Sequence, residues 1–135
     1  VLLTQAFAKA ERPEEQNASV VNILDQRLAQ PHGVQLAYTL GKAGLEAFTR
    51  IAARTLAPGI RVNAVAPGLT LATYDYTPEQ LDRLAGLTPL DRLPVSEDIA
   101  EAVLYLAKAR AITGQTIFVD GGAHMRSYDR DFMRL

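Results

Sequence analysis

A tyrosine and a lysine stand one helical turn apart in this sequence. Tyr38 and Lys42 are separated by four positions, so on a helix their side chains share one face. A phenol with a pKa near 10 is a poor proton donor at neutral pH, and a nearby ammonium group favours its phenolate. Lowering that pKa by roughly 3 units takes about 4 kcal/mol. A lysine about 4–5 Å away in a partly dry site can supply much of this energy. The spacing indicates an acid/base pair or, read alone, an ordinary pair on an exposed helix.

Two further features follow apolar runs that suit buried strands. Asp25 follows the run 19–24, and Pro67, Gly68, Leu69 and Thr70 follow the run 60–66. Open α/β sheets bind ligands beyond the carboxyl ends of their strands, and a glycine there lets a ligand approach the backbone. Read singly, Asp25 suits a loop cap and Pro67–Gly68 a plain turn. Together with Tyr38 they predict a ligand site at one sheet edge.

The composition excludes several classes of protein. With 135 residues, 48% hydrophobic and 21% charged, the chain is one ordinary globular domain. Lys and Arg total 14 and Asp and Glu total 15, so no charge excess favours nucleic acid or an anionic membrane. Cysteine is absent, which excludes disulfides and thiolate sites and fits a reducing, cytoplasmic compartment. His32 and His124 are too far apart in sequence to suggest a metal site.

Hydrophobic periodicity predicts alternating helices and strands. The expected helices are 1–10, 38–57, 78–85 and 96–109, and the expected strands are 19–24, 60–66 and 115–119, with loops at 25–33, 69–77 and 88–94. Thr77 is the expected N-cap of the third helix and Ser96 begins the cap of the fourth, in which Leu104 is expected among the inward residues. Such an order implies right-handed crossovers and a parallel sheet with helices on both faces.

Small residues are dense near the start of the helix expected at 38–57, where Leu40 and Ile51 are expected on the apolar face. Gly41 and Gly44 each cost about 1 kcal/mol against alanine in a helix interior, so they indicate close packing. Packing on the sheet of the same chain and packing on a helix of another subunit account for them equally well.

The first residues of the sequence predict that further secondary structure precedes them in a longer polypeptide. The residues from Val1 to Phe7 read as the middle of an amphipathic helix that has no cap. A three-stranded parallel sheet would leave an apolar edge of its first strand unpaired. We therefore expect a longer parent polypeptide.

Several stretches together resemble the short-chain dehydrogenase/reductase family. They are Val20-Val21-Asn22-Ile23, Tyr38-Thr39-Leu40-Gly41-Lys42-Ala43, Arg61-Val62-Asn63-Ala64-Val65-Ala66-Pro67-Gly68, Thr113-Gly114-Gln115 and Val119-Asp120-Gly121-Gly122. The resemblance covers essentially the whole chain. It implies that residues 1–135 are one domain, the C-terminal part of a Rossmann-type doubly wound α/β sheet, with three strands and their flanking helices. It also implies that the protein is an NAD(P)H-dependent oxidoreductase that acts on a small molecule. Members of the family form dimers or tetramers through their long helices, so a homo-oligomer is expected.

The resemblance also implies roles for individual residues. Tyr38 matches the catalytic acid/base, and Lys42 matches the residue that holds the nicotinamide ribose and lowers the pKa of the tyrosine. Pro67, Gly68, Leu69 and Thr70 match the segment that contacts the nicotinamide end of the cofactor. The family's glycine-rich phosphate loop has no counterpart in this sequence, so the dinucleotide-binding half is expected to be missing from these residues.

Asp25 stands where the family usually has a serine. Serine donates a hydrogen bond to a substrate carbonyl, whereas an ionised carboxylate only accepts one. A carboxyl group beside Tyr38 suits reduction of a C=N bond, because the ring nitrogen must gain a proton. Asp25, as a third catalytic residue, makes the chain similar to pteridine reductases and the related dihydromonapterin and dihydrofolate reductases. That branch implies NADPH, with NADH as the alternative.

Other readings stay open beside the pterin reductase. Asp25 is incidental if the chain reduces carbonyls or oxidises alcohols, and a half-domain without its phosphate loop suits a non-catalytic assembly module. Tyr74 and Tyr76 either stack on a flat heterocycle or pack within a lid. His124 and Arg126 belong to a solvated tail or border a neighbouring subunit's site, and Asn22 and Asn63 are expected as structural residues at strand ends.

Overall fold

The computed structural model describes residues 1–11, 13, 17–71 and 76–128. Its elements are helix α1 (Leu2–Lys9), strand β1 (Ala18–Ile23), the 3-10 turn η1 (Gln26–Leu28), helix α2 (Leu36–Thr55), strand β2 (Ile60–Pro67), helix α3 (Pro78–Ala85), helix α4 (Ser96–Lys108), strand β3 (Thr116–Val119) and the 3-10 turn η2 (Ala123–Met125). The order of helices and strands is the one expected from periodicity. The two short turns were not predicted.

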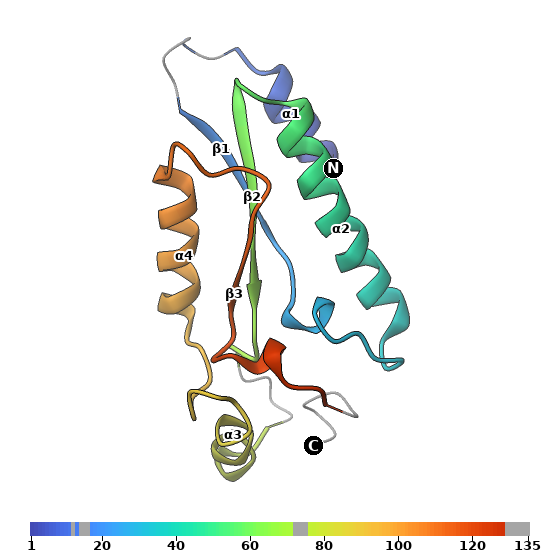
Figure 1. Cartoon of the computed structure of the whole chain (residues 1–135), viewed down its shortest axis with the longest axis vertical. Coiled ribbons are helices and arrows are strands. Elements are labelled where there is room, and N and C mark those ends of the chain that lie inside the picture. The colour runs from blue at the N-terminus through green and yellow to red at the C-terminus, as the bar shows by residue number, and fades with distance from the viewer. Residues whose placement is uncertain (12, 14–16, 72–75, 129–135) are drawn as a thin grey trace.

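The three strands form a parallel sheet in the order β1-β2-β3. Val20 is aligned with Val62 on the next strand, and Val65 is aligned with Ile117 on the third. Helices α1 and α2 lie on one side of the strands and α4 lies on the other, as Figure 1 shows. The α/β doubly wound arrangement expected from the sequence is therefore confirmed for the part of the fold that this chain contains.

The core lies on both sides of β2. Every residue from Ile60 to Ala66 is buried, because helices cover both faces of this central strand. Ile60 and Val62 pack with Ala52 and Ala53 of α2, and the neighbouring cluster joins Leu24, Ala64 and Ala66. The two polar residues within this run, Arg61 and Asn63, are also buried, and both side chains donate to backbone carbonyl groups.

Helix α2 differs from its expected form in its bounds and in its buried face. It begins at Leu36 instead of Tyr38 and ends at Thr55. Leu40 and Ile51, expected on the apolar face, are 62% and 64% exposed. The buried face instead carries Thr49, Ala52 and Ala53, and Leu40 and Ile51 lie on the opposite side of the helix. The larger Phe48 is partly buried and packs against the core.

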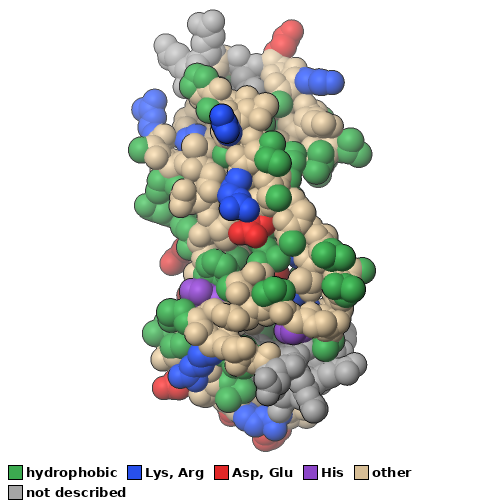
Figure 2. All heavy atoms as spheres, turned by 45° about the vertical axis from the view of Figure 1, so that its right-hand side comes forward, with side chains coloured by type: hydrophobic (Ala, Val, Ile, Leu, Met, Phe, Trp, Pro, Cys, Tyr) green, Lys and Arg blue, Asp and Glu red, His purple; other side chains and the backbone are tan. Residues whose placement is uncertain are grey.

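The two helix glycines also lie away from the sheet. A Cβ atom added at Gly41 or Gly44 would meet no described atom within 4 Å. Close packing within the described residues therefore does not account for them. Figure 2, in which the α2 side of Figure 1 is turned toward the viewer, shows several exposed hydrophobic side chains.

Helix α4 is anchored to β2 by a buried arginine. Arg61 donates to the carbonyl oxygens of Leu106 at 2.7 Å and Ala107 at 2.8 Å, near the end of the helix. These carbonyls have no partner within the helix, so the guanidinium supplies it. Leu106 is fully buried, but Leu104, expected inward, is 55% exposed because it falls on the opposite face.

The caps of the last two helices follow from short-range hydrogen bonds. Thr77 Oγ1 accepts from the backbone N–H of Gln80, and Gln80 Oε1 accepts from that of Thr77, which is the expected cap of α3. Helix α4 is capped at Val95, whose backbone N–H donates to Asp98 Oδ2, rather than at Ser96.

Structural asparagines hold the sheet to its connections. Asn22, near the end of β1, donates to Thr49 Oγ1 of α2. Asn63 lies inside β2, not at its end, and bridges the carbonyl of Ile112 and the backbone N–H of Gln115.

Among the residues that the structure describes, no helix has the length and hydrophobicity needed to span a membrane.

Candidate active site

The carboxyl ends of all three strands meet at one end of the molecule, the lower end in Figure 1. Asp25 follows β1 by two residues, Gly68 follows β2 directly and Asp120 follows β3 directly. Parallel strands bring the loops after them to the same edge, which is where open α/β sheets bind ligands.

Tyr38 and Asp25 are joined at this edge. The hydroxyl group of Tyr38, in the first turn of α2, donates a hydrogen bond to Oδ2 of Asp25 at 2.9 Å. Asp25 also caps the 3-10 turn η1, since its Oδ1 accepts from the backbone N–H of Arg27. The loop-capping role and the pairing with Tyr38 therefore belong to the same carboxylate.

Lys42 lies one turn further along α2. Its Nζ atom donates to the carbonyl oxygen of Ile23 at 2.8 Å and lies 5.6 Å from the centre of the Tyr38 ring. The end of β1 thus holds the ammonium group beside the phenol. This is the neighbourhood in which a positive charge favours the phenolate form of a tyrosine.

Arg27 is a further charged residue of this group that the sequence analysis did not identify. Its Nε atom is 3.4 Å from Asp25 Oδ1, and its Cζ atom lies 5.1 Å from the centre of the Tyr38 ring. An arginine two residues after an aspartate at the end of a strand was the available signal. The sequence offered no indication that its side chain folds back toward Tyr38.

One cavity of about 580 Å³ includes all the residues expected at the site. Its lining contains Asp25, Tyr38, Lys42, Pro67, Gly68, Leu69 and Thr70. Tyr76, His124 and Arg126 line it as well, whereas Tyr74 is outside the described residues. A volume of this size lies within the range of small-molecule and cofactor sites.

Gly68 has a structural role in addition to the one expected. A Cβ atom at this position would lie 2.9 Å from both Cα and Cβ of Asp120. The glycine is therefore required by the close approach of the chain after β3, not by a ligand alone. Thr70 stabilises the same turn by donating from Oγ1 to the carbonyl of Gly68 at 3.0 Å.

Asp120 holds His124 against the cavity. The nearly inaccessible carboxylate of Asp120 accepts from the backbone N–H groups of Gly122 and His124 and lies 2.9 Å from His124 Nδ1. The imidazole stacks on Phe118 with ring centres 4.3 Å apart. His124 is thus part of the cavity wall of its own chain instead of a solvated tail.

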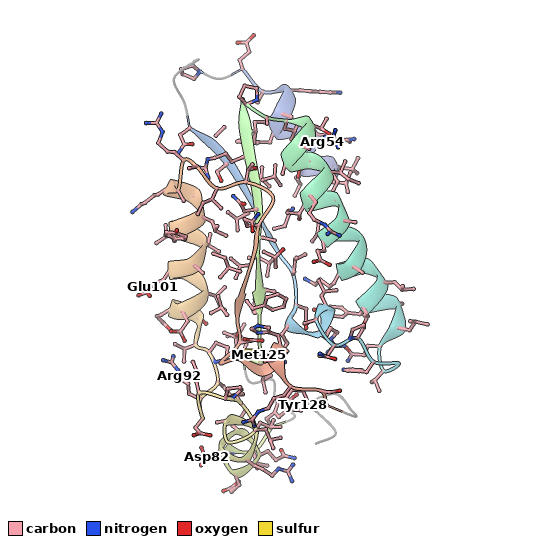
Figure 3. The ribbon with its side chains drawn as sticks, viewed as in Figure 1. Arg54, Asp82, Arg92, Glu101, Met125 and Tyr128 are labelled. Atoms are coloured by element: carbon pink, nitrogen blue, oxygen red, sulfur yellow. The ribbon has the colours of Figure 1, made fainter. Side chains whose placement is uncertain are left out.

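The chain after β3 closes one side of the cavity. Arg126 and Tyr128 both donate to the carbonyl of Leu87, at 2.6 Å and 3.0 Å. Burial raises the pKa of the Tyr128 hydroxyl, so this donor keeps its proton. Figure 3 shows Met125 and Tyr128 beyond the end of β3, on the side of α3.

Within the described residues, no cluster of three His, Cys, Asp or Glu side chains is placed to hold a metal ion.

Comparisons with known proteins agree with this architecture. A family model described as enoyl-(acyl carrier protein) reductase matches residues 1–124. The chain is 42% identical over 113 residues to the granaticin polyketide synthase putative ketoacyl reductase 2 of Streptomyces violaceoruber, covering 81% of this chain and 45% of the relative. It is 30% identical over 126 residues to the dihydromonapterin reductase of Citrobacter koseri, covering 93% of this chain and 52% of the relative.

A solved structure is similar over nearly the whole chain. FolM alternative dihydrofolate reductase 1 from Brucella suis, in complex with NADP, superimposes with a TM-score of 0.86 and 42% identity, covering 94% of this chain and 51% of the other. The chain thus spans about half the length of the relatives it matches. The match to the family model, the relatives and the shared fold show that this chain belongs to the short-chain dehydrogenase/reductase family.

Proposed function

We propose that the cavity is the active site of an NADPH-dependent reductase that acts on a C=N bond of a pterin or a related heterocycle. The observation that carries the proposal is the hydrogen bond from the Tyr38 hydroxyl to Asp25 Oδ2. It couples the candidate proton donor to a carboxyl group instead of the serine usual in the family. The similarity to a dihydromonapterin reductase and to a dihydrofolate reductase supports this substrate class.

Reduction of a C=N bond adds a hydride to carbon and a proton to nitrogen. Bound NADPH supplies the hydride. The Tyr38 O–H bond breaks as the new N–H bond forms, which leaves a phenolate on the enzyme. Lys42, whose Nζ atom lies 5.6 Å from the ring centre, stabilises that negative charge. Asp25, in hydrogen-bond contact with the phenol oxygen, relays the replacement proton from solvent.

The residues of the cavity suit one end of the cofactor. Lys42 carries three N–H donors, of which one is used on Ile23, so others are available for ribose hydroxyl groups. Pro67, Gly68, Leu69 and Thr70 follow β2 into the same cavity, where they would contact the nicotinamide end. A glycine-rich phosphate loop is not in this sequence. That the dinucleotide-binding half comes before Val1 stays a prediction, which the intact mass of the purified protein tests.

Carbonyl reduction is the alternative supported by a specific observation. Repulsion between an ionised Asp25 and the developing negative charge of a carbonyl oxygen argues against this reaction. However, the Arg27 guanidinium lies 3.4 Å from Asp25 Oδ1 and offsets the carboxylate's charge. The similarity to a ketoacyl reductase also favours this second reaction.

A substrate comparison separates the two reactions. The complete polypeptide in which this chain occurs would be supplied with NADPH and one of three substrates: a dihydropterin, dihydrofolate or a 3-ketoacyl thioester. The loss of NADPH absorbance measures turnover. The proposal predicts the larger kcat/KM for the pterin or the folate. A larger kcat/KM for the thioester assigns the carbonyl reaction, and no turnover of any of these substrates favours an assembly module.

The proposed enzyme is a homo-oligomer. Leu36, Leu40 and Ile51 form an exposed apolar stripe along α2, and Gly41 and Gly44 lie on the same open part of the helix. A stripe of this kind supports a contact between helices of two subunits. Sedimentation of the complete polypeptide tests it, and the cytoplasmic location stays a prediction.

A further inference from the structure

Arg27 and Tyr38 contact different oxygen atoms of the Asp25 carboxylate. The backbone N–H of Arg27 donates to Oδ1 at 2.9 Å, and the Nε atom of the same residue lies 3.4 Å from that oxygen. Oδ2 accepts from Tyr38 at 2.9 Å. Both contacts of Arg27 therefore fall on the carboxylate oxygen that the tyrosine does not use.

The same arginine also contacts the start of helix α2. Its terminal Nη1 atom donates to Gln35 Oε1 at 2.9 Å. Gln35 is the N-cap of α2, held in a left-handed backbone conformation at φ 59°, and it precedes Tyr38 by three residues. Arg27 thus connects the loop that carries the carboxylate to the helix turn that carries the phenol.

The surroundings make this contact more effective than an ordinary surface ion pair. The side chains of Arg27 and Asp25 are only 15% and 20% exposed, so water screens them less than it screens surface charges. The guanidinium also lies over the Tyr38 ring, with Cζ 5.1 Å from the ring centre. A lysine at this position would place a point charge there but lacks the planar fork of donors that reaches two partners at once.

We propose that Arg27 is a positioning residue for the Asp25–Tyr38 pair. It orients the carboxylate so that Oδ2 faces the tyrosine hydroxyl, and it offsets the carboxylate's charge beside the reacting atoms. Its side chain also lines the cavity, but we assign its effect to the orientation of Asp25. This inference rests on the function proposed above, with either the C=N or the carbonyl substrate, because both use Tyr38 as the proton donor.

The experiment is a double-mutant cycle in the complete polypeptide. Arg27→Met is expected to lower kcat by about 10- to 100-fold, because the donor pair is misplaced, while KM and the dissociation constant of NADPH change little. In an Asp25→Asn background, the same Arg27→Met change is expected to have less than a threefold further effect. Arg54→Met is the matched control, since Arg54 lies on α2 at the end far from η2, as Figure 3 shows, and is expected to keep wild-type kcat.

Two further measurements keep the proposal falsifiable. Arg27→Lys is expected to recover only part of the lost kcat, and a crystal structure of cofactor-free Arg27→Met is expected to show the Tyr38–Asp25 hydrogen bond broken. A raised KM with unchanged kcat would assign Arg27 to substrate binding instead, and equal losses in both backgrounds would also overturn the proposal. If the unmodified protein turns over neither substrate class, the proposed function fails. The crystal structure still tests the positioning role in that case.

Discussion

Tyr38 and Asp25 are thirteen residues apart in sequence, and the hydroxyl group of one donates to the carboxylate of the other at 2.9 Å. The strand β1 and the helix α2 converge at this hydrogen bond, with Lys42 one turn beyond it. The pair combines a group that can give a proton with a group that can replace it.

Removing the hydroxyl of Tyr38 tests the proton donor. Tyr38→Phe is expected to lower kcat by about 10²- to 10⁴-fold, the usual contribution of a general acid, while NADPH binding is largely kept because the ring remains. Steady-state kinetics and a fluorescence titration with NADPH measure the two effects. Tyr105→Phe, on an exposed position of α4, serves as the control. Unchanged turnover in Tyr38→Phe would assign proton donation to another group.

Replacing the carboxylate tests the choice of substrate. Asp25→Ser is expected to lose turnover of dihydropterin or dihydrofolate, because serine cannot relay a proton to Tyr38 as a carboxyl group does. Turnover of a ketoacyl thioester is expected to fall less, since the serine restores the family's usual donor to a carbonyl oxygen. The ratio of the two kcat/KM values is the measurement. If pterin turnover is unaffected, the C=N argument is wrong.

Lys42 is expected to serve cofactor and tyrosine together. Lys42→Ala removes the ammonium group that lies 5.6 Å from the phenol ring centre and is fixed on Ile23. Both NADPH affinity and kcat are expected to fall, whereas Tyr38→Phe affects mainly kcat. Binding and kinetics measured on the same preparation separate the two patterns. Lys9→Ala, at the end of α1, is the control for the loss of one lysine.

Two glycine substitutions are expected to change stability in opposite directions. Gly68→Ala places a Cβ atom 2.9 Å from Cα and Cβ of Asp120, so the free energy of unfolding is expected to fall by about 1–3 kcal/mol. In the unassembled subunit, a Cβ atom in Gly41→Ala meets no described atom within 4 Å, and the change is expected to raise this free energy by about 0.5–1 kcal/mol. Urea unfolding of both variants measures the difference. If Gly68→Ala unfolds with the same free energy as the unmodified protein, the segments that follow β2 and β3 can move apart at little cost.

Much of the architecture follows from patterns in the sequence alone. The mainly apolar run at 60–66 predicts a buried strand, and β2 is one because helices pack on each side. Thr77 and Pro78 predict the start of α3 because capping depends on atoms only three residues away. The motifs that resemble the family likewise identify its fold, and they point to Tyr38, Lys42 and Asp25 as the residues to examine.

Contacts between distant residues could be learned only from the tertiary structure. Leu40 and Ile51 are expected on the apolar face but lie outside, because α2 turns Thr49 and Ala52 toward the core and the two larger residues fall on the opposite side of the helix. Arg27 belongs to the Tyr38 cluster because its guanidinium turns toward Asp25 and Gln35, a direction that depends on where α2 begins. Local hydrogen-bond chemistry determines the elements and their caps, whereas the packing of helix on sheet determines which side chains meet.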